Sequence, residues 1–337
     1  MKHEGYILKQ EDSNLSIDSH IYIDEGSRII NAIGAELAQS VHMDPEHRTI
    51  LSLAASMGRD GHVLMDSHPG LGKTTIAKAL ADIRGGTYTR FQGSPDLTTS
   101  DITGNVIYKN GDFQFIPGPI FGDIVLGDEV NRSNAREQAA LIEPLAESQV
   151  TVNGVTYELP AHHMLLATQN AQNIETGTQL LTNGLKDRFA VSMKFDPYKA
   201  DDMVTAAEYG IKGVKANQRL SPGDLALVQR AVGLVALSKS VKYRTANIII
   251  SLRDSELSRE LDPELTVLAG ARPAIIIYRL ATLNAIKNGQ QEVYDTDVDR
   301  VAKYVLQHRT GLKFGSKATF DELYEDALKM NPQKTIQ

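Results

Sequence analysis

The chain has 337 residues, of which 42% are apolar, and a formal net charge of −7. A chain of this length exceeds the size at which one core usually stops growing, so two domains are expected. The acidic balance argues against wholesale nucleic-acid binding, and the absence of cysteine excludes disulfides, zinc–thiolate sites and thiol nucleophiles. No apolar run approaches the roughly 18 residues of a membrane span, and the N-terminus is polar, so the sequence predicts a cytoplasmic protein without membrane insertion.

The first part of the chain divides into a polar segment and a helical one. Residues 1–25 are polar and poorly periodic. From 27 to 57, apolar residues such as Ile29, Ile33 and Leu37 recur at helical spacing, which predicts two helices. The apolar run at 62–65 then predicts the first strand.

A phosphate-binding loop follows this strand and leads into a helix-like stretch at 76–81. It comprises Ser67, His68, Pro69, Gly70, Leu71, Gly72, Lys73, Thr74 and Thr75, with Ser67 where the usual pattern has glycine. The glycines let N–H groups point at phosphate oxygens, and the helix N-terminus adds partial positive charge. Lys73 would reach the β- and γ-phosphates of a nucleoside triphosphate, and the Thr74 hydroxyl would ligate Mg²⁺. A glycine-rich turn with an incidental lysine is the alternative, disfavoured because strand, turn and helix agree.

Further strand-like runs recur at 87–91, 124–127, 164–168 and 190–193, separated by helical stretches such as 135–146. This alternation predicts a parallel α/β sheet. Two hairpins interrupt it at 107–115 and 150–157, each built on an Asn-Gly pair that suits a type I′ turn, Asn110-Gly111 and Asn153-Gly154. We expect the exposed tips of these hairpins to contact another protein on which this one acts. The alternative is that each hairpin packs only against its own subunit.

Helical periodicity dominates after residue 197. It predicts helices over 224–238, 246–261, 273–287 and 295–308. The change in pattern places a domain boundary near 197–201.

Two adjacent carboxylates, Asp128 and Glu129, end the apolar strand at 124–127. In a phosphate-loop enzyme Asp128 would help to hold Mg²⁺, and Glu129 would polarise the water that attacks the γ-phosphate. An Asp-Glu pair after a strand is more often a solvated turn. The phosphate loop upstream reverses that preference.

Two later residues complete the candidate catalytic set. Asn170 follows the strand-like run at 164–168 and would orient the attacking water. A turn-forming asparagine is the simpler interpretation. Arg188 precedes the last strand and could project into a neighbouring subunit's nucleotide, where a guanidinium neutralises transition-state charge. A surface salt bridge with Asp187 or Glu175 is the alternative for Arg188.

These motifs together resemble the MoxR family of AAA+ ATPases. The resemblance covers about 30–200 and is carried by 69–74, 118–121, 128–132, 141–147, 149–154, 166–170 and 185–189. It implies an α/β fold: an αβα core with a five-stranded parallel sheet, then an all-α helical lid. It also implies a homo-oligomeric ring, usually a hexamer, with ATP and Mg²⁺ between neighbours.

The implied domains are a polar segment at 1–25, the nucleotide-binding core at 26–198 with hairpin inserts at about 105–116 and 148–159, and the lid at 199–337. In the lid, the stretch 268–274 stands where the family reads approximately L-G-A-S-P-R-A, with arginine and proline exchanged. Arg272 is the candidate sensor arginine, since Pro273 suits a first helical turn and would leave Arg272 facing the cleft. Arg279 is a weaker substitute.

Three functions of different class fit the sequence. The first, implied by the resemblance, is an ATPase that remodels or assembles a protein or cofactor-bearing complex, alongside a partner with a von Willebrand factor A domain. The second is a nucleic-acid motor, against which stand the acidic total and hairpin tips with only Lys109 nearby. The third is a nucleotide-gated scaffold with little turnover, against which Glu129 and Asn170 argue.

Overall fold

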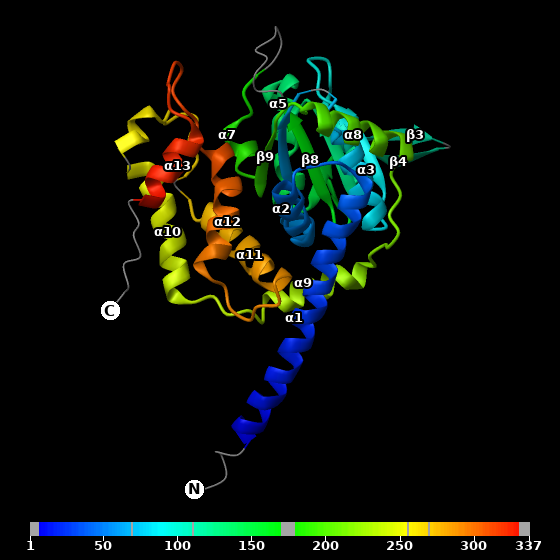
Figure 1. Ribbon diagram of the computed structural model, residues 1–337. Coiled ribbons are helices and arrows are strands. Elements are labelled where there is room, and N and C mark those ends of the chain that lie inside the picture. Colours follow the sequence, from blue (N-terminus) through cyan, green and yellow to red (C-terminus); the bar gives the residue numbers. More distant parts are fainter. Residues whose placement is uncertain are drawn as a thin grey trace.

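The computed structural model describes residues 7–68, 70–109, 111–169, 179–254, 256–268 and 270–329. Its centre is a five-stranded sheet of order β2-β5-β8-β1-β9 in which all paired strands run parallel (Figure 1). The strands are β1 Val63–Ser67, β2 Tyr88–Gln92, β5 Ile124–Asp128, β8 Met164–Gln169 and β9 Val191–Phe195. The predicted α/β core with a parallel sheet is confirmed.

The sheet is buried because helices cover both of its faces. Alternate residues of β1 enter two different cores: Val63 and Met65 join a large apolar cluster, and Leu64 joins a smaller one. A strand buried on both faces has a continuous apolar sequence. This is why β5 and β8 could be recognised from their residues.

Two helices precede the sheet, as expected, but the first is longer than predicted. Helix α1 spans Ile7–Ser40 and so includes most of the predicted polar segment. Helix α2, Pro45–Ser56, begins where Asp44 accepts hydrogen bonds from the backbone N–H groups of Glu46 and His47. Helix α3, Lys73–Ile83, follows β1 and packs against α1.

Two antiparallel hairpins leave the core, β3 Gly104–Lys109 with β4 Asp112–Pro117, and β6 Gln149–Val152 with β7 Val155–Glu158. In the second, Asn153 and Gly154 have φ angles of 50° and 79°, as a type I′ turn requires. In the first, Gly111 has φ 89°, and Asn110 lies outside the described residues. Phe115 stacks on Tyr157 with ring centroids 4.0 Å apart, so the hairpins support each other.

After β9, helices dominate the described residues, as predicted. Its helices are α8 Ala200–Lys212, α9 Pro222–Val232, α10 Lys239–Asp254, α11 Arg272–Lys287, α12 Asp295–Leu306 and α13 Phe320–Lys329. The helix expected at 224–238 ends at Val232, and the one expected at 246–261 is α10. The chain between them leaves helical geometry, and the Ser238 hydroxyl accepts a hydrogen bond from the N–H of Val241 at the start of α10. Helix α8 was not predicted, and none of its residues is buried.

The first residues after 199 are attached to the nucleotide-binding core by hydrogen bonds. The N–H of Leu220 donates to the carbonyl of Ile83, and the Tyr209 hydroxyl donates to the carbonyl of Ala38, which fastens α8 and the start of α9 to the core. Helix α1 also packs against α9 and α11, so one apolar cluster runs through core and lid. Within the described ranges, no helix has the length and apolar character needed to cross a bilayer.

Candidate nucleotide site

The phosphate loop lies at the carboxyl end of β1, which runs between β8 and β9. Ser67 is the last residue of β1 and pairs with Phe195, so this position is extended and accepts a Cβ. Gly70 and Gly72 have φ angles of 86° and 78°, in the left-handed region that favours glycine. Pro69 lies outside the described residues, and His68 is half-buried.

Lys73, Thr74 and Thr75 form the first turn of α3 and are half-buried. The Nζ atom of Lys73 donates to the carbonyl of Ser67 over 3.4 Å, which folds the lysine back across the loop. Leu71 is buried and anchors the loop to the core. The ammonium group and the free N–H groups of the helix start thus lie on one side of the loop, where an anion would bind.

Asp128 and Glu129 lie at the same edge of the sheet, since parallel strands end together there. The hydroxyl of Thr168, on β8, donates to Oδ1 of Asp128 at 2.7 Å and accepts from the N–H of Glu129 at 2.8 Å. Glu129 has φ 52° and ψ 46°, a left-handed conformation that turns the chain sharply after the strand. Asn170, two residues after Thr168, lies outside the described residues.

Three further side chains contact the two carboxylates and were not predicted. Arg90 Nη2 lies 2.7 Å from Oδ2 of Asp128. Oε2 of Glu129 accepts from Gln92 Nε2 and from Arg132 Nη1, both at 3.2 Å. Arg90 and Gln92 lie two positions apart on β2, so both side chains are on one face of the strand that pairs with β5. This pair of polar residues on one strand face was the only sequence feature that could have indicated the contacts.

Arg188 lies at the opposite, amino-terminal edge of the sheet. The next residues lead into β9, and the N–H of Ala190 donates to the carbonyl of His62, just before β1. Nε of Arg188 is buried and has no hydrogen-bond partner. The alternative reading for Arg188, a salt bridge with Asp187, is not supported, because Asp187 binds Arg272 and Arg309 instead. Glu175 lies outside the described residues.

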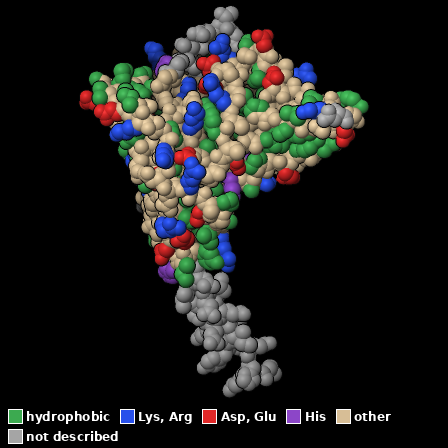
Figure 2. Space-filling view, turned by 90° about the vertical axis from the view of Figure 1, so that its right-hand side faces the viewer, with side chains coloured by type: hydrophobic (Ala, Val, Ile, Leu, Met, Phe, Trp, Pro, Cys, Tyr) green, Lys and Arg blue, Asp and Glu red, His purple; other side chains and the backbone are tan. Residues whose placement is uncertain are grey.

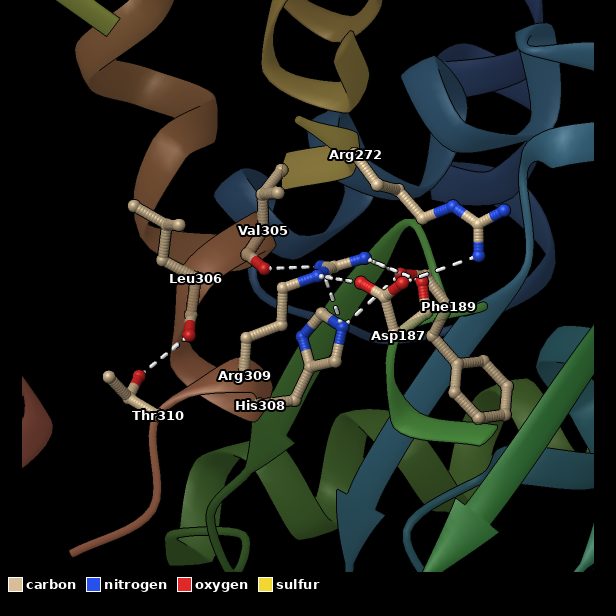
Figure 3. A network of polar contacts seen from close by, with 8 residues as sticks. All are labelled: Asp187, Phe189, Arg272, Val305, Leu306, His308, Arg309 and Thr310. Carbon is tan, nitrogen blue, oxygen red and sulfur yellow. Dashed lines mark hydrogen bonds and ion pairs between the residues drawn. The ribbon is translucent and has the colours of Figure 1, made fainter. Parts of the chain in front are cut away.

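Arg272 also lies at this amino-terminal edge, as the first residue of α11. Its Nη1 is 3.3 Å from Oδ2 of Asp187 (Figure 3). It therefore does not face the phosphate loop of its own subunit, contrary to the expectation from the cap position. Arg279 is held elsewhere, by the carboxylate of Asp60 and the carbonyl of Met57.

A cavity of about 800 Å³ opens beside the loop, between the start of α2 and α12. Its lining includes His42, Tyr198, Lys199, Lys303, Tyr304 and Phe320. A smaller hollow of about 90 Å³ shares 194–197 with it and reaches Ser67 and His68. Burial raises the pKa of Tyr304 to about 12, so its hydroxyl stays neutral and can donate a hydrogen bond. The size and the mixed aromatic and polar lining suit a nucleoside.

This fold and this edge of the sheet define an AAA-type ATPase with its lid. The profile of the ATPase family associated with various cellular activities (AAA) matches residues 62–191, and that of the AAA lid domain matches residues 265–327. The protein is an ATP hydrolase.

Comparison with relatives narrows the class. The protein YeaC of Bacillus subtilis is 32% identical over 284 residues, which cover 83% of this chain and 85% of that protein. Chaperone MoxR1 of Mycobacterium tuberculosis is 31% identical over 263 residues, covering 77% and 70%. A crystal structure from Cytophaga hutchinsonii, provisionally described as an ATPase, has a TM-score of 0.78 at 26% identity and covers 96% and 98%. The chain belongs to the MoxR family of AAA+ ATPases.

Proposed function

We propose that subunits of this ATPase form a ring, six in number by family likeness, that couples ATP hydrolysis to the remodelling or assembly of a protein or cofactor-bearing complex. The observation that carries the ring is the placement of Arg188 at the edge of the sheet opposite the phosphate loop. The five residues of β9 separate these edges by roughly 16 Å at about 3.3 Å per residue. Arg188 cannot serve its own site but can serve a neighbour's.

Within one site, the roles follow from the chemistry of the side chains. Lys73 holds the β- and γ-phosphates while Thr74 and Asp128 offer the oxygen ligands that Mg²⁺ prefers, and the bound ion would neutralise phosphate charge. The residues present fit such an ion. Thr168 orients the carboxylate of Asp128, and the second oxygen of that carboxylate already binds a positive charge, the guanidinium of Arg90. Glu129 accepts the proton of the attacking water, and Asn170 is assigned to orient that water.

Two exposed arms support a client-binding role. Tyr108 and Phe113 are 67% and 73% exposed on the first hairpin, with rings 5.2 Å apart, and Val155 is exposed on the second. Figure 2 shows hydrophobic side chains along an arm that projects from the body. Phe115 instead packs on Phe121 and Tyr157. The hairpins thus have a structural side and a free apolar side, which suits a protein client or a von Willebrand factor A domain partner. Cytoplasmic location stays a prediction.

The test of the shared site compares two inactive variants with their mixture. Glu129→Gln should bind ATP but not hydrolyse it, whereas Lys73→Ala should lose affinity. Arg188→Ala should lose about 10³-fold or more in turnover without losing nucleotide affinity. Mixed rings of Arg188→Ala and Glu129→Gln contain some intact interfaces and should recover turnover. If co-assembled mixtures stay inactive, the shared site is wrong; if Glu129→Gln alone turns over at the wild-type rate, Glu129 is not the base.

A further inference from the structure

Arg309, in the lid, is completely buried although it carries a charge. It lies in the short 3₁₀ turn Gln307–Arg309 that follows α12. A buried guanidinium is costly unless nearly all its N–H groups are paired. Its partners therefore indicate what this side chain is placed to hold.

Three hydrogen bonds of Arg309 go to the two residues that flank Arg188. Nε donates to Oδ1 of Asp187 at 3.2 Å, and Nη2 donates to the carbonyls of Asp187 at 3.0 Å and Phe189 at 2.7 Å. Nη1 donates to the carbonyl of Val305 at 2.5 Å, which fixes the guanidinium to the end of α12. Figure 3 shows the guanidinium between α12 and the strand that Phe189 precedes.

Other contacts reinforce this attachment of the 187–189 segment to the lid. Arg272 binds the second oxygen of Asp187, and Nε2 of His308 lies 3.2 Å from the carbonyl of Phe189. Lys186 Nζ donates to the carbonyl of Leu265 at 3.1 Å. The backbone on both sides of Arg188 is thus fixed by lid residues, while the Arg188 side chain itself is not among their partners.

We propose that Arg309 is a positioning residue that sets the direction in which Arg188 is presented to the neighbouring subunit. This inference rests on the proposed sharing of the site. A lid movement that shifts the end of α12 would move the backbone of Arg188 with it. The lid of one subunit would then regulate ATP turnover in the next.

The test uses Arg309→Lys in the full-length protein, with Arg244→Lys as the matched control. Arg244 is also a lid arginine with a two-point ion pair, to Asp299 at 2.8 Å, but it does not touch 187–189. Lysine keeps the charge and loses the planar fork. Since a misplacement of about 1 Å can cost about 10²-fold in rate, turnover should fall by that order in Arg309→Lys, with unchanged ATP affinity, and little in the control.

Mixed rings then separate positioning from general damage. Arg309→Lys should recover turnover when mixed with Glu129→Gln, because its own site is intact, and should not recover when mixed with Arg188→Ala, because neither supplies a working arginine. Recovery with Arg188→Ala would overturn the proposal. The proposal would also be overturned if Arg309→Lys recovered turnover with neither variant in co-assembled rings. The substitution would then have damaged its own ATP site as well.

Two controls keep these outcomes distinct. If the Arg188→Ala and Glu129→Gln mixture itself fails to recover, the shared site is wrong and this inference falls with it. If Arg309→Lys does not fold, Asp187→Asn removes the ion pair from a partly exposed side chain and must show the same pattern of recovery. Full activity of Asp187→Asn in that case would overturn the proposal.

Discussion

The hydroxyl of Thr168 donates a 2.7 Å hydrogen bond to the carboxylate of Asp128 from the neighbouring strand. The same oxygen accepts from the N–H of Glu129, so one fully buried side chain fixes both acidic positions. The positions of both acidic residues therefore depend on a buried threonine of the neighbouring strand.

Thr168→Val keeps the shape of this side chain but leaves the N–H of Glu129 without its partner. We expect a loss of about 1–3 kcal/mol in the free energy of unfolding and a larger relative fall in kcat than rise in KM for ATP. Thr245→Val is the control, since Thr245 is equally buried and its hydroxyl donates to the carbonyl of Val241, far from the site. Denaturant titration and steady-state kinetics give both readouts; unchanged kcat would contradict the expectation.

Arg90 competes with Mg²⁺ for Asp128 if that carboxylate is a metal ligand. Its ion pair is partly exposed, and such pairs are worth about 0.2–1 kcal/mol. Arg90→Ala should therefore lower the Mg²⁺ concentration at half-maximal turnover by about 1.4- to fivefold. Arg253→Ala, which breaks a surface pair with Asp254, should leave it unchanged. A higher Mg²⁺ requirement in Arg90→Ala would show that Arg90 assists the ion.

Stability should fall as pH falls, partly through His163. Burial lowers the pKa of His163 from 6.5 to about 4, and the nearby buried His62 is shifted in the same direction. The unfolded chain binds more protons between these values, so the contribution is complete above about 6.5 and is lost toward 4, at about 1.4 kcal/mol per pH unit.

His163→Asn tests this, because the asparagine amide can still donate to the carbonyl of Gly122, as Nδ1 does. The unfolding free energy of the variant should depend less steeply on pH between 6.5 and 4. Replacement of the exposed His20 by asparagine is the control. Equal slopes for His163→Asn and the unmodified protein would exclude the assignment.

The hairpin tip should matter for partners and not for folding. Tyr108→Ser combined with Phe113→Ser removes two exposed rings, so the unfolding free energy and basal turnover should stay within error. Stimulation of turnover by a protein client or partner should be lost. Phe314→Ser, at an exposed aromatic of the lid, is the control. Undiminished stimulation in a folded ring would restrict the hairpins to a structural role.

Short runs of consecutive residues were enough to predict the sheet and the phosphate loop from the sequence. The strands at 124–128 and 164–169 are buried on both faces, and the Asn-Gly pairs demand a specific turn, so each could be read from a few consecutive residues. The carboxylates Asp128 and Glu129 followed because a parallel strand ends at a known edge.

The contacts that the sequence did not predict join residues that are far apart in the chain. Arg90 reaches Asp128 across 38 positions, and no local pattern marks that contact. Helix α8 is different, because apolar residues such as Met203, Val204 and Ile211 recur at helical spacing but are exposed, and the helix was not predicted. The direction of Arg272 was wrong because it depends on how the lid is mounted on the sheet, which no run of residues encodes.

The attachment of Arg188 to the lid has a consequence for synthesis. Asp187 precedes Arg272 by 85 residues and Arg309 by 122, so the sheet is translated well before the residues that fix this segment. The nucleoside cavity is also lined by lid residues, Lys303, Tyr304 and Phe320, so a nascent subunit completes its own ATP site and the attachment of Arg188 at about the same stage of translation. In cell-free synthesis, ATP binding and turnover should therefore appear together, and ATP binding by chains that end before α12 would contradict this. Unfinished chains would thereby neither bind nor hydrolyse ATP.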